Sequence, residues 1–461
     1  MHLRPVVVGL VTGLAACTAQ PADDPPGSRP EPLFRVEGGA IATGDGEVVF
    51  LRGINLSQES KDEPFLYPLE LEDAGRMLAH GFNTVRFLTV WEAVMPRGPH
   101  AIDDRYLEDV VAQVWALESM GLFVVMDMHQ DLWGPPFGDG APEWACPEEV
   151  RAGYEPQSPW WRNYSSPQVT GCFDRFWSDE ALQDRFIEAW TAVASAVCSH
   201  DNVVGFDLLN EPWPGTAFGS PSFENDVLYP FYLRAMDAIE TVCPGRVYFL
   251  EPLFTYSLGL SDPIELPDAV RDRVVMSPHY YPPEVHEPGV GYQGDAGTLE
   301  AAVLALLDDM LDQGYPVWIG EWGGLTDNPG FDAYVRDASD VFLRHFVGSA
   351  LWEYSEGATG FSLLDREGDE RQVYRSLREV PTPTRVPAVP DVIVPRNDDA
   401  ALELRFRCSP DRRVSIVIPG RGEASCRAEP EAGLYVVPAL PGFFDAHCVA
   451  GGDVTLTCRA E

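Results

Sequence analysis

The sequence predicts a (β/α)8 TIM barrel followed by a small C-terminal antiparallel β-sandwich domain. From residue 48 to about residue 380, apolar strand-like runs alternate with longer segments of helical period. Acidic and polar residues directly follow most of these runs, where a barrel enzyme keeps its reactive groups. Near Pro381 the pattern changes to proline-rich segments and then to short stretches that alternate apolar and polar residues.

Eight strand-like runs account for the barrel. They start near Val48, Phe82, Leu122, Val203, Arg246, Arg273, Pro316 and Ser349. Helical periodicity lies between them, for example over residues 69–80, 106–120, 181–198 and 299–313. An open doubly wound sheet would give the same alternation, but no Gly-x-Gly-x-x-Gly fingerprint follows the first run, so a barrel is favoured.

The barrel domain is predicted over residues 33–380 and the β-sandwich domain over residues 385–461. Residues 381–384 and 387–395 carry several prolines and predict a linker that lies along a surface. Residues 402–406, 414–418 and 454–457 have the alternation of short antiparallel strands.

The N-terminus has the features of an export signal. Arg4 precedes a short apolar run from Val6 to Ala16, which is too short to span a bilayer. The run ends in Leu14-Ala15-Ala16-Cys17, which resembles the lipobox of bacterial lipoproteins. The resemblance implies that Cys17 is lipidated after removal of a signal peptide over residues 1–17, with residues 18–32 as a flexible tether. The protein would then be anchored to the outer membrane or cell surface; ordinary signal cleavage and secretion is the alternative.

Eight cysteines remain besides Cys17. An even count in an exported chain favours disulfides, and no Cys-x-x-Cys or His-rich cluster predicts a metal site. We therefore expect no metal and no cofactor. Eight cysteines allow 105 connectivities, and the simplest hypothesis joins sequence neighbours: 146 with 172, 198 with 243, 408 with 426, and 448 with 458.

The charge balance excludes one class of partner. The 72 acidic and 32 basic residues give a formal net charge of −40, whereas binding nucleic acid requires a basic face. The same charge predicts repulsion from anionic membrane surfaces. A solvated acidic surface that aids solubility is the simplest interpretation, and we expect a monomer.

Polar groups follow six of the eight predicted strands, and two of those groups are glutamates. Glu211 follows the run Val203–Leu209, and Glu321 follows the run Pro316–Ile319. Glycoside hydrolysis needs such a pair, because one group protonates the leaving oxygen and the other attacks or activates water. Each of the other residues has a bland structural explanation alone, but the set is hard to obtain by chance: Arg86, His129, Asp131, Asn210, His279, Tyr281 and Trp352.

These strings resemble glycoside hydrolase family 5, and within it the endoglycoceramidases. The resemblance rests on Met128-His129-Gln130-Asp131, on Asn210 to Gly215, on Leu250-Glu251-Pro252 and on Trp352. Lys61, after the first strand, also has a counterpart there. The resemblance covers residues 48 to about 380.

The resemblance implies a role for each matching residue. Glu211 would be the acid/base and Glu321 the nucleophile of a retaining β-glycosidase, with carboxyl groups about 5 Å apart. Arg86 and Tyr281 would hydrogen-bond the nucleophile, and Arg86 would lower its pKa. The remaining sugar-binding residues would be Asn210 at the 2-hydroxyl, with Lys61, His129, Asp131 and Trp352 lining the first sugar subsite and His279 close to them.

The substrate is harder to infer. Residues 132–179 form an insertion rich in aromatic side chains, including Trp133, and Trp213 follows the fourth strand. These rings predict either an apolar slot for the lipid of a glycolipid or a core internal to the insertion. The main hypothesis is cleavage between the glycan and the ceramide of glycosphingolipids. The alternatives are another family 5 β-glycosidase, acting on glucosylceramide, a steryl glucoside or a β-glucan, and a non-catalytic glycan-binding lipoprotein.

Overall fold

The structure is a computed structural model that describes residues 32–357, 359–378, 381–396, 401–419, 424–437 and 442–460. Residues 32–461 form one compact unit. The predicted signal peptide, Cys17 and residues 18–31 of the predicted tether lie outside the described residues.

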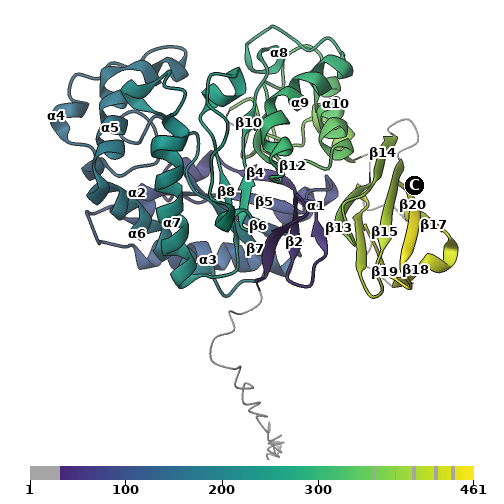
Figure 1. Cartoon of the computed structure of the whole chain (residues 1–461). Helices are drawn as coiled ribbons and strands as arrows, with labels where there is room; N and C mark the ends of the chain where they lie inside the picture. The colour runs from purple at the N-terminus through teal and green to yellow at the C-terminus, as the bar shows by residue number, and fades with distance from the viewer. Residues whose placement is uncertain are drawn as a thin grey trace, which may run out of the picture. The chain divides into compact units, whose positions relative to one another are not determined.

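Eight parallel strand positions form the predicted barrel (Figure 1). The chain closes because β12 pairs with β4 and because Met276 of β9 bridges to Val317, next to β11. The sixth position is divided between the short strands β9 and β10. The strands are β4 (Arg52–Leu56), β5 (Thr84–Val90), β6 (Phe123–His129), β7 (Val203–Asp207), β8 (Val247–Leu250), β9 (Val274–Met276), β10 (His279–Tyr280), β11 (Trp318–Gly323) and β12 (Gly348–Tyr354).

All eight predicted strand positions are occupied, and one boundary was wrong. The run near Val48 divides into β3 (Val48–Val49), which belongs to a different sheet, and β4, which begins at Arg52. The register then aligns the polar strand ends, with Asn55 beside Arg86 and His279 beside Glu321.

Helices follow the strands where their sequence supplies a cap. The side chains of Asp103, Asp179 and Asp295 accept backbone N–H groups at the starts of α3, α6 and α9. The four helices predicted from periodicity are present as α1, α3, α6 and α9. The helices are α1 (Leu71–Ala79), α2 (Trp91–Val94), α3 (Asp104–Ser119), α4 (Glu148–Arg151), α5 (Pro167–Ser178), α6 (Glu180–Val197), α7 (Tyr229–Val242), α8 (Pro283–His286), α9 (Ala296–Asp312) and α10 (Phe331–Arg344).

The C-terminal region contributes two antiparallel sheets, as predicted. One has the order β1-β2-β3-β13-β16-β19-β18, and the other has the order β14-β15-β20-β17. Residues from both sheets share one hydrophobic core that includes Phe406 and Ile416. The strands are β1 (Phe34–Glu37), β2 (Ala40–Thr43), β13 (Thr382–Val386), β14 (Val392–Arg396), β15 (Ala401–Cys408), β16 (Arg413–Val417), β17 (Ala424–Glu429), β18 (Leu434–Val437), β19 (Phe443–Cys448) and β20 (Gly452–Ala460).

The proline-rich segment is not the surface linker predicted from its composition. Thr382 and Val386 are buried in β13, which pairs with β3 on one side and β16 on the other. The register shifts between Pro383 and Arg385, and such an irregularity accommodates a proline that cannot donate to the ladder. Pro395 lies in β14, which is an edge strand.

Four disulfides are formed, and the neighbour pairing is half correct. Cys146 bonds Cys172 and Cys198 bonds Cys243, as predicted. The predicted bonds 408–426 and 448–458 are replaced by Cys408–Cys448 and Cys426–Cys458. Sequence proximity fails here because antiparallel pairing brings distant strands together. Cys426 lies directly opposite Cys458 on β17 and β20, and Cys408–Cys448 joins the two sheets.

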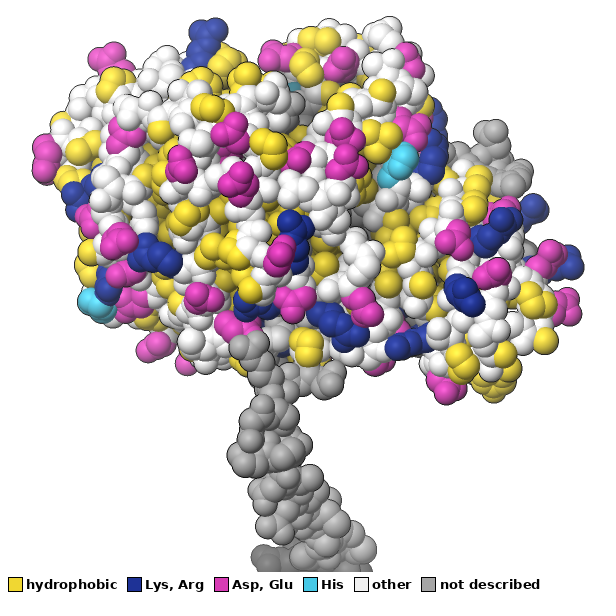
Figure 2. All heavy atoms as spheres, viewed as in Figure 1, with side chains coloured by type: hydrophobic (Ala, Val, Ile, Leu, Met, Phe, Trp, Pro, Cys, Tyr) yellow, Lys and Arg dark blue, Asp and Glu magenta, His cyan; other side chains and the backbone are white. Residues whose placement is uncertain are grey.

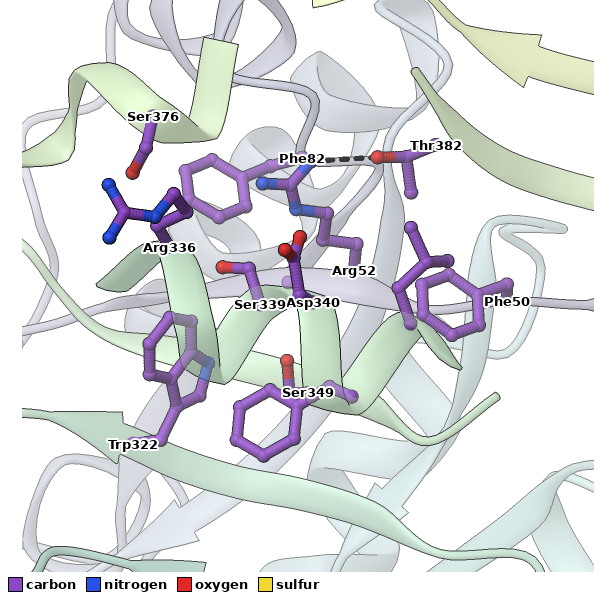
Figure 3. Close-up of a pocket in the computed structure, with 13 residues that line it drawn as sticks. Phe50, Arg52, Phe82, Trp322, Arg336, Ser339, Asp340, Ser349, Ser376 and Thr382 are labelled. Carbon is purple, nitrogen blue, oxygen red and sulfur yellow. Dashed lines mark hydrogen bonds between the residues drawn. The ribbon is translucent and has the colours of Figure 1, made fainter. Parts of the chain in front are cut away.

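A cavity lies at the N-terminal ends of the barrel strands, away from the two glutamates. Figure 3 shows the Arg52 side chain there, with Thr382 and Asp340 beside it. Arg52 donates to Thr382 Oγ1 at 2.7 Å and to the Leu377 carbonyl at 3.3 Å. Burial lowers the pKa of Arg52 to about 10, and Asp340 opposes that shift. Arg52 therefore links the first barrel strand to the C-terminal sheets.

The acidic excess lies on the surface as scattered side chains. Figure 2 shows Asp and Glu spread over the visible face rather than gathered in one patch. Within the part of the chain that the structure describes, no helix combines the length and apolarity needed to cross a membrane.

Candidate active site

Glu211 and Glu321 face each other at the C-terminal ends of the barrel strands. Glu321 lies within β11, and Glu211 lies in the turn after β7. One carboxylate oxygen of each lies within 4.8 Å of the other. Retaining glycosidases hold their carboxyl groups about 5–5.5 Å apart and inverting ones about 6.5–9.5 Å apart. The separation therefore fits the retaining geometry.

Two donors hold Glu321, one on each carboxylate oxygen. Arg86 Nη1 donates to Oε1 at 2.8 Å, and the Tyr281 hydroxyl donates to Oε2 at 2.8 Å. Glu321 is only 5% exposed, and this burial raises its pKa above the ordinary value. His279 and Arg86 oppose the shift without reversing it. The expectation that Arg86 lowers the pKa is thus right for its own contribution and wrong for the net shift.

Arg86 is the central cation of the site and is fully buried. Burial lowers its pKa, but four carboxylates around it raise the pKa well above the ordinary value. The guanidinium presents its donors in a rigid fork, so these partners fix its plane. They are Asp127, Asp207, Glu251 and Glu321, with the side-chain oxygens of Asn55 and Asn210 as further acceptors.

His279 lies between the two catalytic candidates. Its Nδ1 is 2.9 Å from Glu211 Oε1 and 3.6 Å from Glu321 Oε2. Its Nε2 is 3.2 Å from Glu251 Oε1. Burial lowers the pKa of His279, but Glu251 and Glu321 raise it well above the ordinary value. These two carboxylates therefore favour the imidazolium form of the ring.

The backbone of Glu211 has a φ of +40°, which L residues rarely adopt. Gln130 stabilises this turn, because its Nε2 donates to the carbonyls of Asn210 and Glu211, each at 2.9 Å. Asn210 accepts from Arg86 at 3.0 Å and donates to the Gln130 carbonyl at 3.0 Å. These bonds fix the carboxyl of Glu211 over the end of the barrel.

The predicted sugar wall is assembled beside the glutamates. The rings of His129 and Trp352 stack with centroids 5.5 Å apart, and Lys61 Nζ lies 4.6 Å from the Trp352 ring. Lys61 donates to Asp131. Burial raises the pKa of Asp131, but Lys61 lowers it below the ordinary range. Asp139, which the sequence did not single out, lies beside this pair, and burial raises its pKa to about 8.

The two tryptophans predicted to bind substrate have different surroundings. Trp133 is 4% exposed and packs edge-on against Trp91, Phe173 and Phe176, so it lies in the barrel core. That burial contradicts a role for its ring as an open substrate wall. Trp213 is half-buried, and its ring stacks on Phe218 and Phe254, which are 51% and 49% exposed.

The aromatic insertion has buried rings and exposed rings. Its inner rings, among them Phe173 and Phe176, join the barrel core through Phe186 and Phe231. Trp160 and Trp161 remain exposed at 49% and 43%. Tyr164 of the same insertion contacts Trp213 with centroids 5.1 Å apart. The insertion therefore packs its inner rings into the barrel core, rather than into a core of its own, and also adjoins the stacked rings after β7 and β8.

Comparison with known protein families identifies the family of this barrel. The family model described as cellulase (glycosyl hydrolase family 5) matches residues 47–357. The chain belongs to glycosyl hydrolase family 5.

Several relatives of this family 5 chain act on glycolipids according to their names. Endoglycoceramidase I of Rhodococcus hoagii (strain 103S) is 32% identical over 271 residues, covering 55% of this chain and 53% of that protein. Glucosylceramidase of Aspergillus fumigatus is 30% identical over 149 residues, covering 27% of this chain and 19% of that protein. The chain thus spans about half the length, or less, of these relatives.

A solved structure is similar over nearly the whole chain. Endo-glycoceramidase II from Rhodococcus sp., in its ganglioside GM3 complex, has a TM-score of 0.79 and 27% sequence identity. The match covers 92% of this chain and 99% of that one. This family 5 chain therefore shares both its barrel and its C-terminal sheets with that structure.

Among the residues that the structure describes, three groups of side chains have ligand-type atoms within 4.8 Å of one another. In each, a cation of the protein already lies beside the oxygens: Lys61, His279 or Arg86. These cations would repel a metal ion, so the donor sets suit proton and hydrogen-bond chemistry better. The groups are His129–Asp131–Asp139, Glu211–His279–Glu321 and Asp127–Asp207–Glu251.

Sequence reasoning missed several residues of the site. Glu251 directly follows β8, so the rule that selected Glu211 and Glu321 would have selected it too. Asp207, the last residue of an otherwise apolar strand, carried the same signal. Gln130 directly follows β6 and carried the signal as well. Asn55 and Asp139 did not, because their roles depend on which groups the fold brings near them.

Proposed function

We propose that the protein is a retaining β-glycosidase that hydrolyses the bond between the glycan and the ceramide of glycosphingolipids, as an endoglycoceramidase does. Glu211 is the acid/base and Glu321 the nucleophile. The observation that carries this proposal is the separation of the two carboxylates by at most 4.8 Å, on a family 5 barrel.

The reaction has two steps. In the first, a carboxylate oxygen of Glu321 bonds to the anomeric carbon while Glu211 gives its proton to the departing ceramide oxygen. Ceramide leaves as an alcohol and the glycan is held as an ester of Glu321. In the second, Glu211 takes a proton from water, the hydroxide oxygen bonds to the anomeric carbon, and the ester bond breaks. Two inversions retain the configuration.

The surrounding side chains support these roles. Arg86 and Tyr281 hold both oxygens of Glu321, so the nucleophile is oriented before the substrate arrives. The wall formed by Lys61, Asp131 and Trp352, stacked against His129, offers charged hydrogen-bond partners and an aromatic face, which a pyranose ring requires. Asn210 lies beside Glu211 and is the candidate partner of the sugar 2-hydroxyl.

The aglycone is assigned to the stacked rings after β7 and β8. Trp213, Phe218 and Phe254 lie nearly parallel, with Trp213 and Phe254 inclined by only 3°. Their exposed faces suit a hydrocarbon chain, and burying each methylene contributes about 0.8 kcal/mol.

A second candidate is a family 5 β-glycosidase that acts on glucosylceramide or a steryl glucoside. The similarity to a glucosylceramidase supports it. It shares the catalytic pair and differs in how much glycan the site accepts; a β-glucan is a further alternative of the same class.

The test of the chemistry uses three variants. Glu321→Gln should abolish turnover, because an amide is not a competent nucleophile. Glu211→Ala should lose glycolipid cleavage but keep activated aryl glycosides, and azide should rescue it as a glycosyl azide of retained configuration. Glu149→Gln, an exposed carboxylate on α4, is the matched control. Near wild-type turnover by Glu321→Gln would refute the assignment, and release of glucose alone would favour the second candidate.

We also propose that the protein is exported and carries a lipid on Cys17. The lipobox motif and the four disulfides of the described residues support an oxidising compartment. Cys17→Ser should move the protein from the membrane fraction to the soluble fraction or block its processing. An unchanged membrane fraction would contradict lipidation of Cys17.

A further inference from the structure

Glu251 is a third carboxylate that touches both halves of the catalytic centre. It follows β8 and is 2% exposed. Its Oε2 accepts the backbone N–H of Glu211 at 2.8 Å. Its Oε1 accepts from Arg86 Nη2 at 2.8 Å and lies 3.2 Å from His279 Nε2.

Burying this carboxylate beside other carboxylates costs free energy, which its contacts with Arg86, His279 and the Glu211 N–H offset. The groups facing Glu251 and His279 are Arg86 from β5, Asp127 from β6, Asp207 from β7, Glu211, Glu321 from β11 and the Tyr232 hydroxyl from α7. Tyr232 donates to the Glu251 carbonyl at 3.1 Å. The Glu251 carboxylate accepts two hydrogen bonds, from the Glu211 backbone and from Arg86, and it pairs electrostatically with His279.

We propose that Glu251 is a positioning residue of the reaction. It holds the Glu211 backbone in its φ +40° conformation and keeps His279 oriented with a proton on Nδ1, between the two catalytic carboxylates. This inference rests on the proposed function, because it assigns a role within that two-step reaction.

The role proposed for Glu251 follows from the charges of Glu211 and Glu321 in each step of the reaction. Before the first step Glu321 is a carboxylate and Glu211 carries a proton. Afterwards Glu321 is a neutral ester, and Glu211 is a carboxylate because its proton has gone to the leaving oxygen. One negative charge therefore passes from Glu321 to Glu211, and the second step returns it when Glu211 takes a proton from water.

His279 is placed to follow that charge. Its Nδ1 is 3.6 Å from Glu321 Oε2 and 2.9 Å from Glu211 Oε1, so a small shift changes which carboxylate receives its hydrogen bond. Glu251 Oε1 lies 3.2 Å from the other ring nitrogen, and its negative charge favours the imidazolium, in which Nδ1 is a donor. Burial raises the pKa of Glu251 to about 7, and the cations His279 and Arg86 oppose this shift and favour the carboxylate.

The main test replaces Glu251 with glutamine, which removes the charge and keeps the size. We expect kcat on an activated aryl glycoside to fall about 10- to 100-fold, as for other residues that orient reacting groups. Losing the carboxylate lowers the pKa of His279, so the ring loses its proton, and its hydrogen bond to the catalytic carboxylates, at a lower pH. The alkaline limb of the kcat/KM profile should therefore move to lower pH by about one unit or more. Glu251→Asp should recover part of the rate, and Glu265→Gln, an exposed carboxylate in the following loop, is the matched control.

A spectroscopic measurement separates this role from a merely structural one. In ¹⁵N-histidine-labelled protein on a Glu321→Gln background, the His279 ring signals report its protonation; the His279→Gln variant assigns them. We expect an imidazolium between pH 5 and 8 with Glu251 present and a titrating ring with Glu251→Gln. Comparison on this background holds the Glu321 charge constant.

The outcomes distinguish the two proposals. A wild-type protein that cleaves neither aryl glycosides nor glycolipids would refute the proposed function itself. An active wild type whose Glu251→Gln variant keeps the same pH limbs and the same His279 signals would overturn the role of Glu251 alone. If Glu251→Gln fails to fold, Glu251→Asp tests the positioning role instead: it keeps the charge but shortens its reach to the Glu211 N–H and to His279, so kcat should fall, and an unchanged kcat would overturn the role.

Discussion

Glu321 illustrates how opposing effects at one residue set its reactivity. Burial raises its pKa, whereas Arg86, His279 and the Tyr281 hydroxyl favour the ionised form. Tyr281→Phe removes one donor to the carboxylate, so the pKa of Glu321 should rise further. We expect the acid limb of the kcat/KM profile to move to higher pH and kcat/KM to fall about tenfold or more.

The measurement is a pH–rate profile on a soluble aryl glycoside. Tyr280→Phe, the adjacent tyrosine, is the control for a lost hydroxyl. An acid limb at the wild-type position in Tyr281→Phe would mean that its hydrogen bond at 2.8 Å does not affect the ionisation of Glu321.

The sequence predicted individual site residues where a polar residue ends or follows a strand, and it assigned no role to most of the others. The rule of a polar residue at a strand end found Glu211, Glu321 and His279, and the fold brings them together. Gln130 binds backbone carbonyls in the turn after β7, and Asn55 binds a carbonyl on β11; no local pattern encodes either contact. Trp133 was misassigned because composition does not tell a core ring from an exposed one.

At the scale of elements, the loops after β7 and β8 form one support for the stacked rings. Asp262 N–H donates to the Pro221 carbonyl at 2.7 Å, and Asn225 Nδ2 donates to the Pro263 carbonyl at 2.9 Å. These bonds hold Phe218 and Phe254, which come from different loops, with ring centroids 6.0 Å apart.

Removing the two exposed rings tests the lipid assignment. The double variant Phe218→Ala, Phe254→Ala should lower kcat/KM for a glycosylceramide about 10- to 100-fold, because apolar surface for the lipid is lost. The rate on a soluble aryl glycoside should change little. Trp115→Ala, an exposed ring on α3, is the control. Equal losses on both substrates would place the rings in the sugar site rather than the lipid site.

His80, the C-terminal cap of α1, makes stability depend on pH. Its Nδ1 is 2.9 Å from the Arg76 carbonyl, and its Nε2 accepts from Arg378 Nε at 3.0 Å, so both nitrogens are used in the neutral ring. Burial lowers the pKa of His80 to about 4, and Arg378 and Arg52 lower it further while the Arg76 carbonyl opposes. The unfolded pKa is about 6.5.

The sign follows from these two values. Between about pH 6.5 and pH 4 the unfolded chain binds a proton that the folded protein does not, so the free energy of unfolding decreases as pH falls through this window. The loss can reach about 3 kcal/mol at pH 4 and is absent above pH 7. Urea unfolding at pH 7.5 and pH 5 should show a smaller pH dependence in His80→Asn than in wild type or in the exposed control His100→Asn. Equal slopes would contradict the assignment.

For the whole molecule, the sequence predicted the barrel and the C-terminal strands but not the sheet that connects them. Alternating runs located all eight barrel positions and the main C-terminal strands, because their periodicity reflects burial on each face. The joining sheet was missed. Strands β1 to β3 precede the barrel. Among them β3 pairs with β13, more than 300 residues later, and only the folded chain brings these segments together.

This shared sheet makes the C-terminal region part of the barrel's support. Val48 and Val49 of β3 pair with Val386 and Arg385 of β13. Phe50 and Leu343 belong to the same buried cluster as Val414 and Phe406. Without residues 381–461, β3 would become an unpaired edge and the apolar side chains beneath it would meet water.

Truncation after residue 380 should therefore reduce solubility and lower the melting temperature before it changes the chemistry. The reason is that the lost core lies at the N-terminal ends of the barrel strands, whereas Glu211 and Glu321 lie at the other end. Soluble yield, thermal melting and activity on an aryl glycoside would be measured together. Tyr435→Ser, an exposed residue of the edge strand β18, is the control for a change in the same sheet. A soluble truncated protein with wild-type melting would contradict the structural role. If it also lost activity on glycolipids alone, the C-terminal sheets would instead be a surface that docks the lipid substrate.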